Sequence, residues 1–393
     1  MVLPSSFEAA LATRLTELWP LLERWVEINS FTGNVAGCDA MATELETAFA
    51  LPGLLARSEP GHGAGRHVAF MTPAYLAGQR ETILIGHHDT VFPPSTFEHF
   101  RRDAEHVYGP GVLDMKGGLA VVRTALAVLA DCQQLAGRGV AMVSVSDEET
   151  GSVDGQRLLH ELAPGAAAAL VFEAGRVADA IVVARKGTGK LRVSVVGKAA
   201  HAGNDLSAGI NAIWALARFV DRVSNLSARD GRVTVNVGLM SGGSSANTVP
   251  AAAHCEIDLR MVQRSDGEAL LVAMQTIADE LAAATGASFH FDGGIKRMPL
   301  EVTPASQALA ARYGAHAHRC GLGQQVAGIM GGGSDANTTA VLGVPSIDGL
   351  GPRGKGFHTH QEFAEIATFE PKVRALLGYL LELPSYSPST ARS

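Results

Sequence analysis

Histidine and carboxylate side chains are common protein ligands of zinc and similar divalent metals. In this chain of 393 residues, such side chains gather in five short segments. Three segments directly follow an apolar run, one lies among glycines, and one lies late in the chain. The segments are His87–Asp89, the stretch 108–118 around Asp114, Asp147–Glu149, Glu173, and the stretch 356–362 around His358.

The pair His87 and Asp89 follows the apolar stretch 81–86, which we interpret as a buried strand. Residues two apart in an extended chain face the same way, so both side chains point to one side. A carboxylate in this position typically orients a histidine that binds a metal. A polar strand end without a metal would show the same pattern, and spacing alone does not choose between His87 and the adjacent His88.

Acidic residues occupy the next three segments. Asp114 stands among glycines just before a predicted helix, where it either faces a ligand or caps the helix. Asp147, Glu148 and Glu149 follow a predicted strand and repel one another unless cations or solvent separate them. Glu173 closes a third apolar stretch. Each segment alone therefore has an ordinary structural explanation.

Taken together, the segments predict one shared metal site. The strands expected at 81–86, 140–145 and 167–172 all lead into a histidine or a carboxylate. Open α/β sheets bind their ligands at the carboxyl ends of the strands. Two imidazoles and three carboxylates in one cleft suit zinc, with cobalt or manganese as alternatives. One further carboxylate beside the metals is what a hydrolase needs as its general base.

Alternating apolar runs and helical patterns predict the fold around this site. They favour a three-layer α/β domain with a largely parallel sheet, made of residues 1–186 and 299–393. Helices are expected at 1–27 and 118–132.

Residues 187–298 follow a different pattern, with the order β-α-β-β-α-β of a ferredoxin-like unit. Glycines at 293–294 and Pro299 mark the return to the first pattern, so we expect an inserted domain of roughly a hundred residues. Its strands are expected at 190–196, 232–239, 252–260 and 287–291, and its helices at 205–226 and 266–284.

Composition excludes several classes of protein. The net charge of −7, with both signs scattered along the chain, favours neither nucleic acid nor a membrane surface as a partner. No apolar run approaches the length that spans a membrane, and the first helix carries charges that a signal peptide lacks. The four cysteines are far apart, which favours free thiols over disulfides or a cysteine zinc site. We expect a cytoplasmic protein.

These motifs resemble those of the zinc aminoacylase/carboxypeptidase family, which includes glutamate carboxypeptidase, acetylornithine deacetylase and succinyl-diaminopimelate desuccinylase. The similarity spans nearly the whole chain. It is strongest to bacterial glutamate carboxypeptidases of the folate-cleaving kind, through the stretch 197–203 (GKAAHAG) and the stretch 331–336 (GGGSDA).

The resemblance implies a centre with two Zn²⁺ ions per subunit, or Co²⁺ or Mn²⁺ in their place. One ion would take His87, Asp114 and Glu173. The other would take Glu149 and His358 and share Asp114 as a bridge. The interval to Glu362 favours His358 over His360. The resemblance also implies that Glu148 is the general base, which would deprotonate a water bridging the metals and pass the proton to the leaving amine. Asp89 would orient His87. The peptide bond after Asp114 would be cis.

The resemblance also implies that the inserted domain forms a lid and the interface of a homodimer. His201 would enter the cleft of the other subunit and stabilise the oxyanion of the transition state. Arg260, Asn247 and the backbone of Gly332 and Gly333 would hold the terminal carboxylate of the substrate, which the planar fork of arginine suits.

The expected activity is therefore hydrolysis of an amide bond next to a free carboxylate, in a peptide or an N-acyl amino acid. A glutamate carboxypeptidase-like metallopeptidase is the first hypothesis, and an N-acyl amino acid deacylase of the acetylornithine deacetylase or aminoacylase type is the alternative. A non-catalytic metal-dependent binding protein on the same scaffold is a third hypothesis, although both Glu148 and Asp114 are present. A serine hydrolase is not expected, since the chain has no Gly-x-Ser-x-Gly motif.

Overall fold

The computed structural model describes residues 3–386, which form two compact units. The first unit comprises the residues up to Val183, then Val302–Ile329, and those from Ser334 onward. The second comprises Ala184–Glu301 and the short segment Met330–Gly333. Residues 187–298, predicted as an inserted domain, fall within the second unit, which extends a few residues further at each end.

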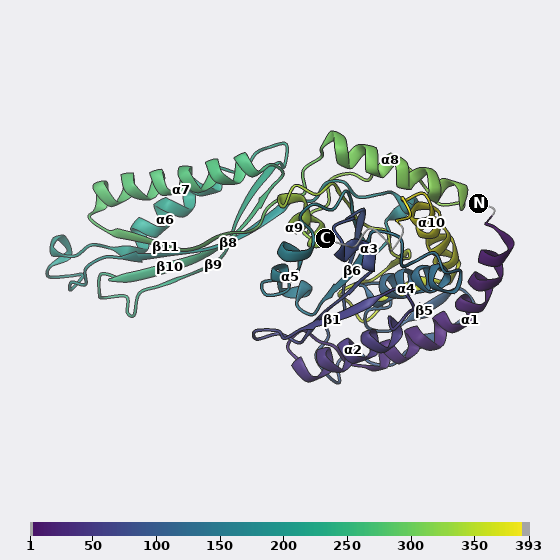
Figure 1. The fold of residues 1–393 in the computed structure, drawn as a ribbon. Coiled ribbons are helices and arrows are strands. Elements are labelled where there is room, and N and C mark those ends of the chain that lie inside the picture. Colours follow the sequence, from purple (N-terminus) through teal and green to yellow (C-terminus); the bar gives the residue numbers. More distant parts are fainter. Residues whose placement is uncertain (1–2, 387–393) are drawn as a thin grey trace. The chain divides into compact units, whose positions relative to one another are not determined.

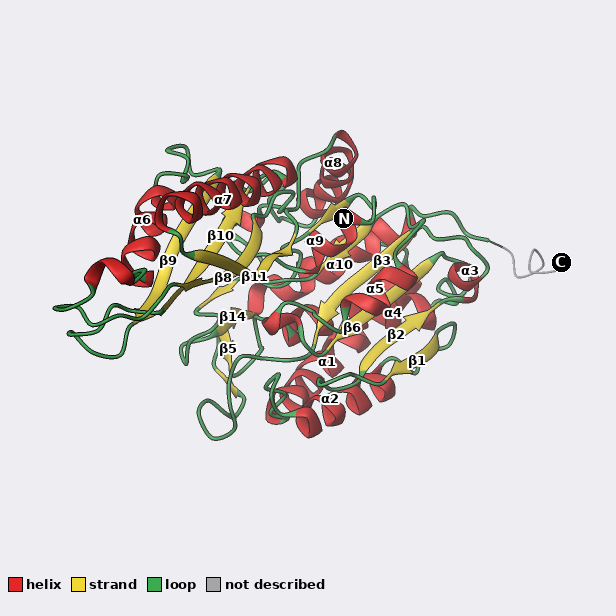
Figure 2. Cartoon of the chain, turned by 90° about the vertical axis from the view of Figure 1, so that its left-hand side faces the viewer, coloured by secondary structure: helices red, strands yellow, loops and turns green. Residues whose placement is uncertain are grey.

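A six-stranded sheet forms the centre of the first unit, in the order β1-β2-β6-β3-β7-β12 (Figures 1 and 2). From β6 to β12 the strands are parallel, as predicted, whereas β1 and β2 add an antiparallel edge. The connection from β1 to β2 is too short for the crossover that parallel strands require. The strands are β1 (Leu55–Glu59), β2 (His67–Met71), β3 (Thr82–His87), β6 (Val140–Val145), β7 (Ala169–Val171) and β12 (Ser346–Ile347).

Helices cover both faces of this sheet and complete three layers (Figure 1). One group comprises α1 (Ser5–Glu27), α4 (Lys116–Asp131), α8 (Pro304–Arg319) and α10 (Phe369–Leu381). On the other face lie α5 (Gln156–Leu162) and α9 (Asp335–Val341), which contact each other. The remaining helices of the unit are α2 (Val35–Ala48) and α3 (Pro73–Leu76), with the short 3₁₀ turns η1 (Glu148–Thr150), η2 (Val177–Asp179) and η4 (Ile366–Thr368).

Helix α4 is the central helix of the core, and nearly all of its side chains are buried. Its first residue, Lys116, is fully buried, and the ammonium group donates hydrogen bonds to the carbonyl oxygens of Trp25 and Ile28, both at 2.9 Å. Burial lowers the pKa of Lys116 to about 8. A buried ammonium group is tolerated only where such acceptors are present. This contact fixes the start of α4 against the end of α1.

A second, smaller sheet of the same unit joins two segments that are far apart in the sequence. Its order is β13-β14-β5-β4, and β14 pairs with β5 so that Phe363 lies opposite Tyr108. The stretches 109–115 and 356–362 are thereby brought together. The strands are β4 (Arg101–Arg102), β5 (His106–Tyr108), β13 (Gly354–Lys355) and β14 (Phe363–Glu365).

The second unit is a four-stranded antiparallel sheet in the order β11-β8-β10-β9, with α6 and α7 on one face (Figure 1). Along β8, buried and more exposed residues alternate, as expected where one face is covered. The predicted β-α-β-β-α-β order is correct. The elements are β8 (Gly187–Val196), α6 (Ala212–Ser224), β9 (Val233–Gly242), β10 (Ala252–Met261), α7 (Arg264–Thr285) and β11 (Ser288–Arg297), with the 3₁₀ turn η3 (Leu206–Ala208).

Several boundaries in this unit differ from the prediction, and the two largest differences are at the start of α6 and the end of β11. The helix expected from residue 205 begins at Ala212, because the side chain of Asn211 caps it by accepting a hydrogen bond from Trp214 N. Gly293 and Gly294 do not end the last strand, which continues to Arg297. A Cβ on Gly293 would lie 2.3 Å from the carbonyl oxygen of Lys190, so glycine is needed there for the close approach of β8.

Within residues 3–386, every helix is too short or too polar to cross a membrane.

The packing of α4 against the strand end at Phe172 leads to a prediction about Gly118. A Cβ at this position would lie 2.0 Å from the carbonyl oxygen of Phe172, next to Glu173. We expect Gly118→Ala to lower the free energy of unfolding by about 1–3 kcal/mol, the usual cost of overpacking. Urea denaturation measures this change. Gly328→Ala is the matched control, because no atom lies within 4 Å of its added Cβ; equal stability of the two variants would contradict the prediction.

Candidate metal centre

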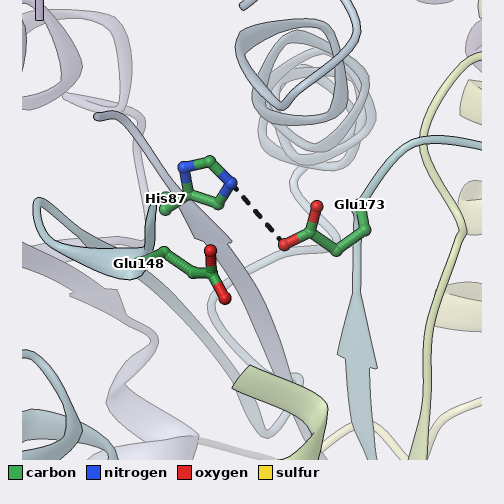
Figure 3. A group of neighbouring side chains, drawn as sticks. All are labelled: His87, Glu148 and Glu173. Carbon is green, nitrogen blue, oxygen red and sulfur yellow. Dashed lines mark ion pairs between the residues drawn. The ribbon is translucent and has the colours of Figure 1, made fainter. Parts of the chain in front are cut away.

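Three parallel strands deliver the first group of candidate ligands to one edge of the main sheet. β3 ends at His87, which lies opposite Val145 at the end of β6, directly before the acidic segment 147–149. β7 ends two residues before Glu173. Figure 3 shows the side chains of His87, Glu148 and Glu173 converging from these three strand ends. The parallel register thus places the predicted residues together.

The imidazole of His87 is buried and held from both sides. Its Nδ1 atom lies 3.1 Å from the carbonyl oxygen of Asp89 and 3.3 Å from the Asp89 carboxylate. Its Nε2 atom lies 3.2 Å from Asp114 Oδ1 and 3.6 Å from Glu173 Oε1. Burial lowers the pKa of His87, but these carboxylates outweigh it and raise the pKa well above its ordinary value. Nε2 is therefore the nitrogen that faces the acidic cluster.

His358 approaches the same cluster from the loop between β13 and β14. Its Nε2 atom lies 3.0 Å from Glu149 Oε2 and 3.3 Å from Asp114 Oδ2. Hydrogen bonds to Asp114 and Glu149 raise the pKa of His358 to about 10. Its side chain is about half exposed, at 49%, so this part of the centre is open to solvent.

Asp114 is the residue that both imidazoles share. One carboxylate oxygen faces His87 and the other faces His358. Burial raises the pKa of Asp114, but the two histidines outweigh it and hold the pKa below its ordinary value. The peptide bond from Asp114 to Met115 is cis, as expected. A carboxylate with one oxygen toward each of two imidazoles has an arrangement that could bridge two metal ions.

Asp89 ties the acidic segment to β3. Its carboxylate accepts hydrogen bonds from the backbone N–H groups of Glu148 and Glu149, at 3.1 and 3.2 Å, and from the hydroxyl of Thr32, at 2.7 Å. Burial raises the pKa of Asp89, but His87 outweighs it and the pKa is lowered. Asp89 therefore positions three residues of the cluster at once. Nothing in the sequence around Thr32 pointed to this contact.

The donor set fits divalent cations. Burial, followed by the charge of Asp114, raises the pKa of Glu173 to about 7, and burial also raises the pKa of Glu149. Negative charge is therefore crowded at the centre, and positive ions would relieve it. In two groups of three side chains, the three possible ligand atoms all lie within 4.8 Å of one another. One group is His87, Glu148 and Glu173, and the other is His87, Asp114 and Glu149.

Glu362 binds the backbone of the loop around Asp114, a role that the sequence motif did not predict. Its side chain is almost fully buried and accepts backbone hydrogen bonds from Leu113 at 2.8 Å, Asp114 at 3.0 Å and Gly111 at 3.2 Å. Burial, followed by the charge of Asp114, raises the pKa of Glu362 to about 8. It thus connects the loop that carries His358 to the loop that carries Asp114.

The neighbouring histidines, His88 and His360, lie in different surroundings. His88 is fully buried, with Nδ1 2.9 Å from the hydroxyl of Ser144, and burial lowers its pKa to about 3. His360 stacks on Phe97, with ring centroids 5.6 Å apart, and also lies near Phe92. Neither belongs to a set of possible ligands among the described residues; His358 is in no such set either, but its Nε2 atom lies close to Asp114 and Glu149.

The remaining predicted site residues belong to the second unit. His201 is exposed, and its Nδ1 atom accepts hydrogen bonds from the backbone of Gly203 and Asn204, both at 3.1 Å. Arg260 donates two hydrogen bonds to Asp258, at 2.8 and 2.9 Å.

Asn247 and the glycine segment complete this group. The side-chain oxygen of Asn247 accepts a hydrogen bond from the hydroxyl of Ser245 at 2.8 Å. The carbonyl oxygen of Gly332 accepts one from Arg185 at 3.1 Å. Gly333 ends the short segment of the glycine-rich stretch that belongs to this unit.

Comparison with known proteins places this geometry in a family. The chain is 26% identical over 372 residues to carboxypeptidase G2 from Pseudomonas sp. (strain RS-16), covering 92% of this chain and 88% of that protein. It is 29% identical over 219 residues to acetylornithine deacetylase from Myxococcus xanthus, covering 52% and 56% of the two chains. The fold is similar to that of aminopeptidase PepT from Bacillus cereus, with a TM-score of 0.78, 22% identity, and coverage of 95% and 99%.

The model of peptidase family M20/M25/M40 matches residues 83–382, a range that contains every candidate ligand. The chain therefore belongs to peptidase family M20/M25/M40 and is a hydrolase of the metallopeptidase and amidohydrolase type.

Proposed function

We propose that this protein is a di-zinc hydrolase that cleaves an amide bond next to a free carboxylate, as a glutamate carboxypeptidase-like metallopeptidase. The observation that carries the proposal is Asp114, whose two carboxylate oxygens face the Nε2 atoms of His87 and His358. One shared carboxylate with an imidazole on each side suits two neighbouring metal ions. Similarity to carboxypeptidase G2 over most of both chains supports the substrate class.

The ligands of the two ions follow from the contacts of the two imidazoles. His87 contacts Asp114 and Glu173, and these three would hold one Zn²⁺. His358 contacts Asp114 and Glu149, and these three would hold the other. Co²⁺ or Mn²⁺ would fit the same nitrogen and oxygen donors. Bound zinc supplies a Lewis acid that polarises the scissile carbonyl and lowers the pKa of a nearby water.

Glu148 is the carboxylate left over, and we assign it as the general base. Its carboxylate lies within 4.8 Å of ligand atoms of both His87 and Glu173. Its backbone N–H is fixed by Asp89. From this position Glu148 would take a proton from the attacking water and return it to the leaving nitrogen.

The substrate-binding roles of the second unit are further proposals. Arg260 and Asn247, with the backbone of Gly332 and Gly333, would hold the terminal carboxylate of the substrate. In the structure Arg260 forms a bidentate ion pair with Asp258, so it would have to exchange Asp258 for the substrate carboxylate. His201 would stabilise the oxyanion, and its Nδ1 contacts orient the ring and leave Nε2 available.

An N-acyl amino acid deacylase is the second candidate, and the similarity to acetylornithine deacetylase favours it. Both activities hydrolyse an amide and differ in what flanks that bond.

We assign the protein to the cytoplasm, because its four cysteines are free thiols, as is usual in a reducing compartment.

We also propose that the second unit forms a homodimer through the edge strand β9. On this strand Leu239 is 63% exposed and Met240 is 47% exposed. Trp214 on the neighbouring helix α6 is 60% exposed and borders a hollow with Ile213 and Pro250. An edge strand with exposed apolar residues is prone to pair with another copy, and the same unit would act as a lid.

The first prediction of this proposal concerns Glu148. We expect Glu148→Gln to lower turnover by about 10²- to 10⁴-fold, the usual contribution of a general base, with an unchanged metal content. The assay is a screen of dipeptides, folates and N-acyl amino acids with added zinc or cobalt, followed by metal analysis. Glu161→Gln, on the exposed side of α5, is the control. Unchanged turnover in the Glu148→Gln variant would contradict its assignment as the general base. An unmodified protein that binds metal but hydrolyses none of these compounds would favour a non-catalytic binding protein.

The second prediction concerns Glu362. Glu362→Ala leaves three buried N–H groups of the Asp114 loop without an acceptor, so we expect zinc affinity to fall by about 10- to 100-fold, as for other residues that position metal ligands. Glu362→Gln retains an oxygen that can accept hydrogen bonds from the backbone of Leu113 and Asp114, so its zinc affinity should fall by less. Competition with a chelator measures the affinity. If Glu362→Ala bound zinc as tightly as Glu161→Ala, the positioning role would be wrong.

The third prediction concerns the dimer. We expect the unmodified protein to have the mass of a dimer in light scattering and Leu239→Glu to have that of a monomer. Val272→Glu is the matched control, since Val272 on helix α7 is 66% exposed, close to the 63% of Leu239. A monomeric unmodified protein would contradict the interface. A monomeric Leu239→Glu variant with full turnover would contradict the role of His201 from a second subunit.

A further inference from the structure

Arg176 is a partly buried arginine of the first unit. In the part of the chain that the structure describes, it forms no ion pair, and its Nε atom is buried without a hydrogen-bond acceptor. Its guanidinium carbon lies 5.9 Å from the centre of the Phe357 ring. A buried N–H group without an acceptor costs about 1–3 kcal/mol. A bound anion would remove that cost.

Arg176 is close to the candidate metal centre in two ways, through its position in the sequence and through an aromatic contact. It follows Glu173 by three residues. Its aromatic neighbour, Phe357, directly precedes His358, and the two rings meet edge to face with centroids 5.5 Å apart. Phe357 is 42% exposed, so this pair borders the solvent-accessible side of the centre.

The stem of Arg176 is supported by the backbone of Gly349. A Cβ on Gly349 would lie 3.5 Å from Arg176 Cγ, and its φ of +75° favours glycine. The nearby Arg353 differs, because it is paired with Asp179 and Glu365, at 2.8 Å each. Arg176 is thus placed beside the centre while its guanidinium remains available. A guanidinium next to an aromatic ring presents a planar fork that matches a carboxylate.

We propose that Arg176 and Phe357 form a subsite for a second carboxylate of the substrate, on the side chain of an acidic amino acid. This inference rests on the proposed function, in which Arg260 takes the terminal carboxylate. It narrows the substrate class to N-acyl or peptidyl derivatives of glutamate or aspartate. Phe357 would contact the methylene groups next to that carboxylate, and Arg176 would bind its two oxygens.

Two substrates that differ only in this group test the proposal. The kinetic constants kcat and KM are measured for N-benzoyl-glutamate and for N-benzoyl-glutamine, which has the same shape without the side-chain charge. We expect Arg176→Gln to lower kcat/KM for the glutamate compound by about 10- to 100-fold, mainly through KM, as for loss of hydrogen bonds to a charged group. The glutamine compound should change by less than about threefold. Arg176→Lys should restore part of the preference.

Arg229→Gln is the control, since Arg229 is exposed and belongs to the other unit. Its preference for glutamate should equal that of the unmodified protein. Equal losses for both compounds in Arg176→Gln, or no loss for either, would overturn the subsite.

A binding measurement separates this proposal from the proposed function. Calorimetry with the zinc-loaded Glu148→Gln variant records affinity for both compounds without turnover. Tighter binding of the glutamate compound, lost on adding Arg176→Gln, supports the subsite even if the unmodified protein hydrolyses neither compound. Equal affinity for the two compounds would overturn the subsite and leave the assignment of Glu148 untouched.

Discussion

The sharing of Asp114 between two imidazoles is the interaction on which the rest of the centre depends. Asp114, Glu149 and Glu173 are crowded into a largely buried cluster, where each carboxylate opposes the ionisation of the others. The two Nε2 atoms at 3.2 and 3.3 Å offset part of that repulsion. Neutral imidazoles with metal ions would offset more of it. The cluster therefore suits cations, which would reduce the repulsion among its carboxylates.

Two of the candidate ligands, Asp114 and Glu149, are positioned by hydrogen bonds to their backbone N–H groups. On one side, Asp89 accepts hydrogen bonds from the main chain of Glu148 and Glu149. On the other side, Glu362 accepts three from the loop of Asp114. Lys116, two residues further, anchors the start of α4 to the end of α1. Because these contacts fix backbone atoms, the side chains of Asp114 and Glu149 are anchored on either side of His358.

Much of this arrangement could be predicted from the sequence, because strand ends are local features. Strand β6 was predicted at its observed residues, and the apolar runs before His87 and Glu173 were predicted as buried strands and contain most of β3 and all of β7. The approach of His358 to Asp114 could not be derived in this way. It depends on the pairing of β14 with β5, two strands of three residues that lie far apart in the sequence. The sequence also showed no sign of the role proposed for Arg176. An arginine that binds an anion and an arginine that faces solvent look the same in a sequence.

Zinc positions test the central claim most directly. Crystals grown with zinc and measured on both sides of the zinc absorption edge give an anomalous difference map without assumptions about ligands. The account predicts two peaks in each chain, one beside His87 and Glu173 and one beside His358 and Glu149, with Asp114 contacting both. A single peak, or two peaks of which only one contacts Asp114, would contradict it.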